Sequence, residues 1–373
     1  MLRGSIPLGR LFGISIRLNY TWFIIFALVT WSLSADYYPL AFDEWSWSTS
    51  LIAGIITSLL FFGSVLAHEL MHSIVAQKLG ITVPSITLFI FGGVAQISEE
   101  PKTPKDELRI ALAGPLTSIA LGFVFWAILY WLGPHSQFIE GVSWWLCWIN
   151  LSLAVFNLIP GFPLDGGRVL RSVLWWRNQN LRRATKIASN IGRGVGYLFI
   201  FGGIFLIFQG LWINGLLLAL IGWFLENTAQ GSYQQVALLD MLYGHTAQEV
   251  MIRDCPAINP ELTVDTLVNE HALTTGRRCF PVTTDGRVSG LITLHDIRAI
   301  PRPLWATKKV SDVMTPFANL KSVSPDDELS TVLRVLTEED INQVLVVNNG
   351  DIAGIIGRDN LLSFIKLRGE LGA

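Results

Sequence analysis

The chain has 373 residues, of which 51% are hydrophobic and only 15% are charged, and its formal net charge is −2. Soluble domains carry about 25% charged residues, so the composition excludes an ordinary soluble protein and favours one that crosses a membrane. The near-neutral charge and the lack of a basic motif give no indication of nucleic-acid binding. The three cysteines, Cys147, Cys255 and Cys279, have neither the spacing of a metal site nor that of a disulfide framework.

Tryptophan usage divides the chain into two parts. Thirteen of the 14 tryptophans precede residue 224, and only Trp305 follows. After about Gly231 the sequence mixes polar residues with short Val/Ile runs, as soluble domains do. We therefore expect a membrane domain over residues 1–230, a linker over 231–245 and a soluble domain in the remainder.

Five apolar segments of the first part are long enough to cross a bilayer as helices. They cover residues 19–35, 50–79, 108–132, 142–160 and 194–226. The last is too long for one ordinary span, and Gln209-Gly210 and Asn214-Gly215 predict a tight turn that divides it into two helices. Six transmembrane helices are therefore expected.

The distribution of basic residues agrees with this number of spans. Lys and Arg occur before the first span, at position 78, between 102 and 109, and between 168 and 193. The loops at 36–47, 135–143 and 209–214 contain none. Because Lys and Arg are enriched in cytoplasmic loops, the pattern predicts a multi-pass protein of the cell membrane with both termini in the cytosol.

The second span contains the motif His68-Glu69-Leu70-Met71-His72. On a helix the two histidines lie one turn apart on the same face, where both imidazoles can bind one Zn²⁺, and Glu69 lies beside them as a candidate base. Ionisable groups at membrane depth are costly and therefore indicate function. The same groups would also suit a polar contact between helices or a proton path in a transporter, and a third ligand decides between these interpretations.

Residues 82–98 are rich in β-branched and aromatic side chains and contain Gly92-Gly93. The segment is too short for a span and predicts a β-hairpin or a re-entrant loop. Such a strand near the metal would hold an unwound substrate as a neighbouring strand, with Gly92 and Gly93 as substrate-positioning residues. The alternative is a hairpin that only packs the domain.

The fourth span runs into Asn157-Leu-Ile-Pro160-Gly-Phe-Pro163-Leu-Asp165-Gly-Gly167. The prolines and glycines stop the helix and leave irregular backbone near membrane depth, at the level of the histidines. Asp165 is therefore the natural third ligand, since two His and one Asp leave a fourth zinc position for water, as in a catalytic site. The alternative is that Asp165 only caps the helix that follows.

That following segment, residues 166–193, has seven basic residues and no acidic one. Trp175-Trp176 lies among them. The pattern predicts one amphipathic helix that lies on anionic headgroups at the cytosolic surface.

HExxH in the second of six spans, followed by NxxPxxPLDG after the fourth, resembles the site-2 protease family of intramembrane zinc metalloproteases. The resemblance covers residues 1–230. Gly92-Gly93 and Ala113-Gly114-Pro115 are further landmarks that resemble the family.

The resemblance implies specific roles for five residues. His68, His72 and Asp165 would bind one zinc ion per chain, and Glu69 would be the general base and acid. Asn157 matches the asparagine of the family's motif, which implies a catalytic role in steadying the oxyanion or the substrate backbone.

The soluble part repeats one pattern, over residues 250–298 and 313–362. Each copy begins with Val-Met and continues with a helix, an apolar strand, a turn (Asp285-Gly286 or Asn349-Gly350), a Gly-apolar-apolar strand and a last helix. This resembles a tandem pair of cystathionine-β-synthase (CBS) domains, which would occupy residues 246–302 and 307–367.

The resemblance to CBS pairs implies a site for an adenine nucleotide (ATP, ADP or AMP). The first copy keeps the Thr and Asp of the nucleotide-binding pattern as Thr293 and Asp296, whereas the second has Gly357 and Asn360. One site would therefore be competent and the other degraded. The alternative is a pair that only packs together or forms a homodimer.

The expected architecture is a polytopic α-helical membrane domain, with six transmembrane helices and a small membrane-associated β element, followed by an α/β tandem CBS module. The expected function is that of an intramembrane zinc endopeptidase in the lipid bilayer. It would cleave within or near a transmembrane helix of a membrane-anchored protein substrate, under control by adenine nucleotide. The alternative is a CBS-regulated metal or ion transporter that uses the His/Glu/Asp cluster, which leaves the hydrolase-like spacing of HExxH unexplained.

Overall fold

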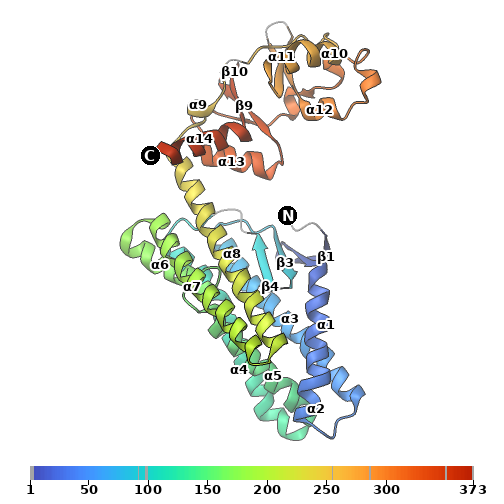
Figure 1. Cartoon of the computed structure of the whole chain (residues 1–373), viewed down its shortest axis with the longest axis vertical. Coiled ribbons are helices and arrows are strands. Elements are labelled where there is room, and N and C mark those ends of the chain that lie inside the picture. Colours follow the sequence, from blue (N-terminus) through green and yellow to red (C-terminus); the bar gives the residue numbers. More distant parts are fainter. Residues whose placement is uncertain are drawn as a thin grey trace. The chain divides into compact units, whose positions relative to one another are not determined.

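The computed structural model describes residues 4–90, 92–96, 100–253, 255–284, 287–348 and 351–371. The chain forms two compact units, Met1–Val236 and Ala237–Ala373. Figure 1 labels their helices and some of their strands. The predicted turns Asp285-Gly286 and Asn349-Gly350 lie outside the described residues.

The first unit is mainly helical. Its helices are α1 Tyr20–Ser32, α2 Tyr38–Ala41, α3 Trp47–Lys78, α4 Pro104–Leu132, α5 Gln137–Asn157, α6 Asp165–Asn178, α7 Leu181–Phe208 and α8 Trp212–Leu242, the last of which extends into the second unit. Of the residues described, five helical stretches are long and apolar enough to cross a membrane: Tyr20–Ala41, Trp47–Lys78, Pro104–His135, Gln137–Asn157 and Leu181–Phe208. The predicted break in the last apolar segment is confirmed, because α7 ends at Phe208 and α8 begins at Trp212.

Polar side chains cap the N-termini of the long helices. Ser46 accepts a hydrogen bond from the backbone N–H of Thr49 at the start of α3, and Thr103 accepts one from Asp106 at the start of α4. Each satisfies a backbone donor that the first helical turn leaves free.

The single amphipathic helix predicted for residues 166–193 is wrong. Gln179 ends α6 in the left-handed conformation, with φ of 51°, and the Asn180 side chain then accepts from Arg183 N at 2.7 Å and starts α7. An N-cap competes with continuation of the preceding helix, so the basic segment divides here. Its second half continues directly into the apolar stretch of α7.

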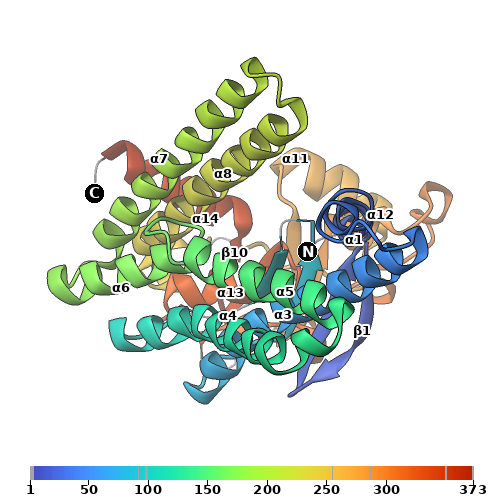
Figure 2. The same ribbon diagram turned by 90° about the horizontal axis from the view of Figure 1, so that it is seen from below.

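The helices approach one another through small residues. Figure 2 shows α4 and α5 running side by side, and a Cβ at Gly122 of α4 would lie 2.8 Å from Leu151 Cδ2 of α5. Between α7 and α8, a Cβ at Gly203 would lie 2.5 Å from the carbonyl oxygen of Gly215. Such close contact is how helices pack in lipid, where apolar burial gives no driving force between them.

A four-stranded sheet completes the unit, in the order β1-β2-β3-β4. Its strands are β1 Ser5–Leu11, β2 Ile14–Asn19, β3 Ser85–Phe89 and β4 Gly92–Gln96. The predicted hairpin is confirmed as the antiparallel pair of β3 and β4, with Thr87 opposite Val94. The N-terminal pair was not expected, although Ile14, Ile16 and Leu18 alternate with polar residues and are buried.

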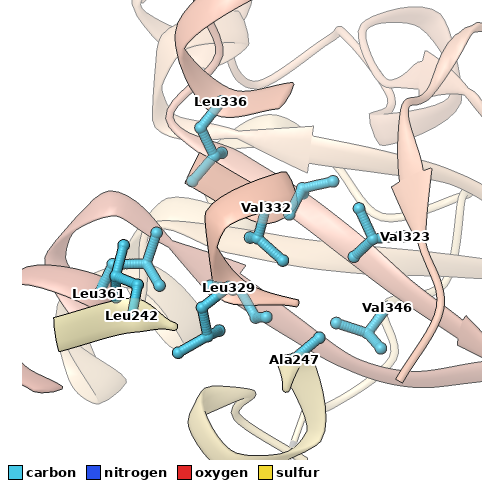
Figure 3. Packing of buried hydrophobic residues seen from close by; sticks show 10 residues of the cluster. Leu242, Ala247, Val323, Leu329, Val332, Leu336, Val346 and Leu361 are labelled. Carbon is cyan, nitrogen blue, oxygen red and sulfur yellow. The ribbon is translucent and has the colours of Figure 1, made fainter. Parts of the chain in front are cut away.

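The second unit contains two three-stranded sheets, in the orders β5-β6-β7 and β10-β9-β8, in which β7 is Thr315–Pro316 and β8 is Ser322–Val323. The first copy supplies β5 Cys279–Thr284, β6 Arg287–Thr293 and α12 Leu294–Arg298, and the second supplies α13 Leu329–Glu338, β9 Gln343–Asn348, β10 Asp351–Gly357 and α14 Arg358–Leu371. Figure 3 shows how Leu329, Val332 and Leu336 of α13 pack against Val323 and Val346. The predicted duplication of strand, strand and helix is therefore observed.

Candidate active site

Three side chains that are far apart in the sequence meet at one point. The Nε2 atoms of His68 and His72, both on α3, lie 3.1 and 3.2 Å from Oδ2 of Asp165 at the start of α6. One ligand atom from each residue lies within 4.8 Å of the other two. The histidines are 3% and 5% exposed, so the cluster is shielded from solvent.

The other nitrogen of each imidazole is held by α4. His68 Nδ1 lies 2.9 Å from Ser118 Oγ, and His72 Nδ1 lies 2.6 Å from the carbonyl oxygen of Ile110. A carbonyl can only accept, so Nδ1 of His72 carries the proton and directs Nε2 toward Asp165. This outer set of hydrogen bonds orients both rings, as it does in metal sites.

The donor set fits a zinc ion. With Nδ1 of His72 protonated, either a second proton or a metal cation has to lie between Nε2 and the carboxylate, because two lone pairs repel. Two imidazoles and an anionic carboxylate are ligands of catalytic zinc sites.

Asp165 does not act as a helix cap. The N-cap position of α6 belongs to Leu164, and Asp165 is the first helical residue, with its Oδ2 against both imidazoles. This geometry supports the ligand interpretation over the capping alternative.

Helix α4 lies directly against the two imidazole Nε2 atoms at Gly114. A Cβ there would be 2.1 Å from His72 Nε2 and 2.5 Å from His68 Nε2, so only glycine leaves room. Sequence reasoning noted Ala113-Gly114-Pro115 as a landmark but gave Gly114 no role, and it missed Ser118. A glycine followed by a proline inside an apolar helix was the available signal for Gly114.

Strand β4 runs beside Glu69. A Cβ at Gly93 would lie 2.4 Å from Glu69 Cγ, and Gly92 has a φ of 127°, which side-chain-bearing residues rarely adopt. Gly93 therefore lets the backbone of β4 approach the candidate base, whereas a Cβ at Gly92 would meet nothing within 4 Å. Asn157 ends α5 and is half-buried, and within the described part of the chain its side chain has no hydrogen bond to the cluster.

In the second unit, Thr293 and Asp296 bond to each other. The Thr293 N–H and hydroxyl both donate to Asp296 Oδ2 at 2.8 Å, and Asp296 N donates to Thr293 Oγ1 at 3.4 Å. This is a reciprocal cap of α12. The second copy has a partial equivalent, in which Gly357 N donates to Asn360 Oδ1 at 2.8 Å.

Long apolar helices around a His₂Asp cluster that could hold a metal ion are typical of a polytopic metalloprotein. The chain matches the model of peptidase family M50 over residues 56–143 and 133–202, and the CBS domain model over 247–301 and 310–367. It is 35% identical to sll0528 of Synechocystis sp., a protein named as a zinc metalloprotease. The match covers 98% of this chain and 96% of that protein. It is 31% identical to zinc metalloprotease MJ0392 of Methanocaldococcus jannaschii, with 98% of each covered.

Among solved structures, the site-2 protease from Methanocaldococcus jannaschii is 33% identical, with 61% of this chain and 95% of that chain covered and a TM-score of 0.41. From the sequence relationships, the chain belongs to peptidase family M50, the site-2 protease family, and it ends in a tandem pair of CBS domains. The relatives' names indicate a zinc metalloprotease.

Proposed function

We propose that this protein is an intramembrane zinc endopeptidase that cleaves a peptide bond within or near a transmembrane helix of a membrane-anchored substrate. The observation that carries the proposal is the convergence of His68, His72 and Asp165 within 4.8 Å. These three side chains would hold one zinc ion. When bound, zinc lowers the pKa of water to about 7 and polarises a peptide carbonyl.

Glu69 is the proposed general base and acid. It follows His68 directly on α3 and lies against β4 at Gly93. It takes a proton from the attacking water and returns it to the leaving amine. Asn157, at the end of α5, is proposed to steady the oxyanion or the substrate backbone.

Strand β4 is the proposed binding site for the unwound substrate. Among the described residues, β4 is the last strand in the sheet order, and it pairs with β3 on one side. A substrate segment added to its free edge would gain main-chain hydrogen bonds, as in other edge-strand complexes. Gly92 and Gly93 are the proposed substrate-positioning residues, and Gly93 leaves room for main chain beside Glu69.

The proposed topology adds α8 as the sixth span and places both termini in the cytosol. The apolar first half of α8 packs on α7 through Gly203 and Gly215, which suits a membrane helix. The proposed protease domain is 1–230, joined by 231–245 to CBS domains at 246–302 and 307–367.

The direct test compares Glu69→Gln, Asp165→Ala and the exposed control Glu140→Gln in the detergent-purified full chain. Zinc per chain is measured by elemental analysis, and cleavage is measured on a single-span reporter protein. We expect Glu69→Gln to keep about one zinc and lose cleavage, Asp165→Ala to lose zinc, and the control to match wild type. A wild type that binds no zinc when zinc is supplied would overturn the proposal and favour the transporter interpretation.

We also propose that adenine nucleotide binds the CBS pair near Thr293 and Asp296 and adjusts access to the protease, and that the pair forms a homodimer. The support is the reciprocal Thr293–Asp296 arrangement at a helix N-terminus in the first copy. Calorimetry of the full chain with ATP, ADP and AMP tests the nucleotide, and light scattering tests the dimer. No heat with any of the three nucleotides would refute the first, and a monomeric mass would refute the second.

A further inference from the structure

A buried ion network connects the helix that carries Asp165 to α4. Arg171 of α6 is 4% exposed, and its Nε donates to Oε1 of fully buried Glu107 of α4 at 2.5 Å. Its Nη2 pairs with the same oxygen and also donates to Oε2 of Glu100 at 2.9 Å. The mechanism proposed above uses none of these three groups.

Stability alone does not explain this network. Removing an ion pair from water costs several kcal/mol per ion, and apolar side chains of similar volume often serve a fold equally well. Glu107 Oε2 is buried and, within the described part of the chain, has no hydrogen-bond partner. What the network does supply is a directional link that fixes one helix against another.

Contacts of Arg171 and its neighbour hold the chain both before and after Asp165. Arg171 lies six residues after Asp165 on the same helix, and its guanidinium lies 5.1 Å from the ring centroid of Phe162, three residues before Asp165. The next residue, Ser172, donates its hydroxyl to the carbonyl oxygen of Pro104 at the start of α4 at 2.7 Å. Helix α6 and the loop before it are therefore both held to the N-terminal end of α4.

Helix α4 also orients both histidines, through Ile110 and Ser118. The position of α6 relative to α4 thus sets the distance from Asp165 to the two imidazoles.

We propose that Arg171 is a positioning residue. Through Glu107 it places Asp165 against the histidines and so sets zinc affinity. The proposal rests on the ligand set proposed above.

The proposal is tested by the zinc dissociation constant of the purified full chain, from competition with a chelator. In the double variant Glu107→Met with Arg171→Met no buried charge is left unpaired, and the exposed Glu100 carboxylate that loses its partner remains in contact with water. We expect zinc affinity to fall about 10–100-fold, as for other outer partners of metal ligands. Arg171→Lys, which keeps the charge but loses the fork geometry, should fall less. Arg177→Met, an exposed position on the same helix, is the matched control and should not change.

The melting temperature of the zinc-free protein shows whether each variant folds. A folded double variant with wild-type zinc affinity would overturn the proposal. A double variant that fails to fold while the Arg177→Met control folds would make the network a folding element and would overturn it as well. A wild type without zinc would instead refute the ligand set itself, so the two failures are distinguishable.

Discussion

Substitution of Gly114 by alanine distinguishes the effect of helix propensity on stability from the effect of the side chain on the metal site. Gly114 lies inside α4, where an alanine ordinarily stabilises a helix by about 0.5–1 kcal/mol. Helix propensity by itself therefore predicts a slightly more stable protein. The structure predicts loss of the metal site instead.

The size of the effect follows from the space at this position. The new Cβ would lie 2.1 Å from His72 Nε2 and 2.5 Å from His68 Nε2, whereas ordinary contacts begin near 3.4 Å. The rings would therefore have to move by about 1.3 Å and about 0.9 Å. Zinc–ligand distances tolerate only about 0.2 Å, so we expect zinc affinity to fall roughly 100-fold or more.

Chelator competition and elemental analysis of the purified protein measure the loss. Gly63→Ala on α3 is the control, because a Cβ at Gly63 meets nothing within 4 Å. It should bind zinc like wild type. Full zinc affinity in Gly114→Ala would refute the inferred approach of α4 to the ligand atoms.

Three further substitutions test other parts of the structure. Ser118→Ala removes the partner of His68 Nδ1 and should weaken zinc binding about 10-fold in the same competition assay; unchanged binding would remove Ser118 from the site. Gly93→Ala places a Cβ 2.4 Å from Glu69 Cγ and should keep zinc but lower kcat about 10-fold or more, whereas wild-type kcat would mean that β4 does not restrict Glu69. Thr293→Ala breaks the reciprocal cap with Asp296 and should cost about 1 kcal/mol, seen as a lower melting temperature of the second unit without nucleotide; no shift would contradict the cap.

Local sequence patterns accounted for most of the elements. Apolar runs marked the long helices, and the glycines near residues 209–215 marked the break between α7 and α8. Two patterns were misread. The alternation of apolar and polar residues at Ile14, Ile16 and Leu18 indicates a strand that was not predicted. Asn180 is a residue type that starts a new helix, which argues against one continuous basic helix.

The sequence alone determined the candidate chemistry, because HExxH places two imidazoles and a carboxylate within one helical turn, and that spacing is local. It also pointed to Asp165, through charge type and predicted depth. Only the tertiary structure decided that Asp165 Oδ2 meets both imidazoles, that α4 orients them through Ile110 and Ser118, and that Gly114 leaves room for the ligand atoms. These contacts join segments far apart in the chain, and they depend on how whole helices pack, which no local period encodes.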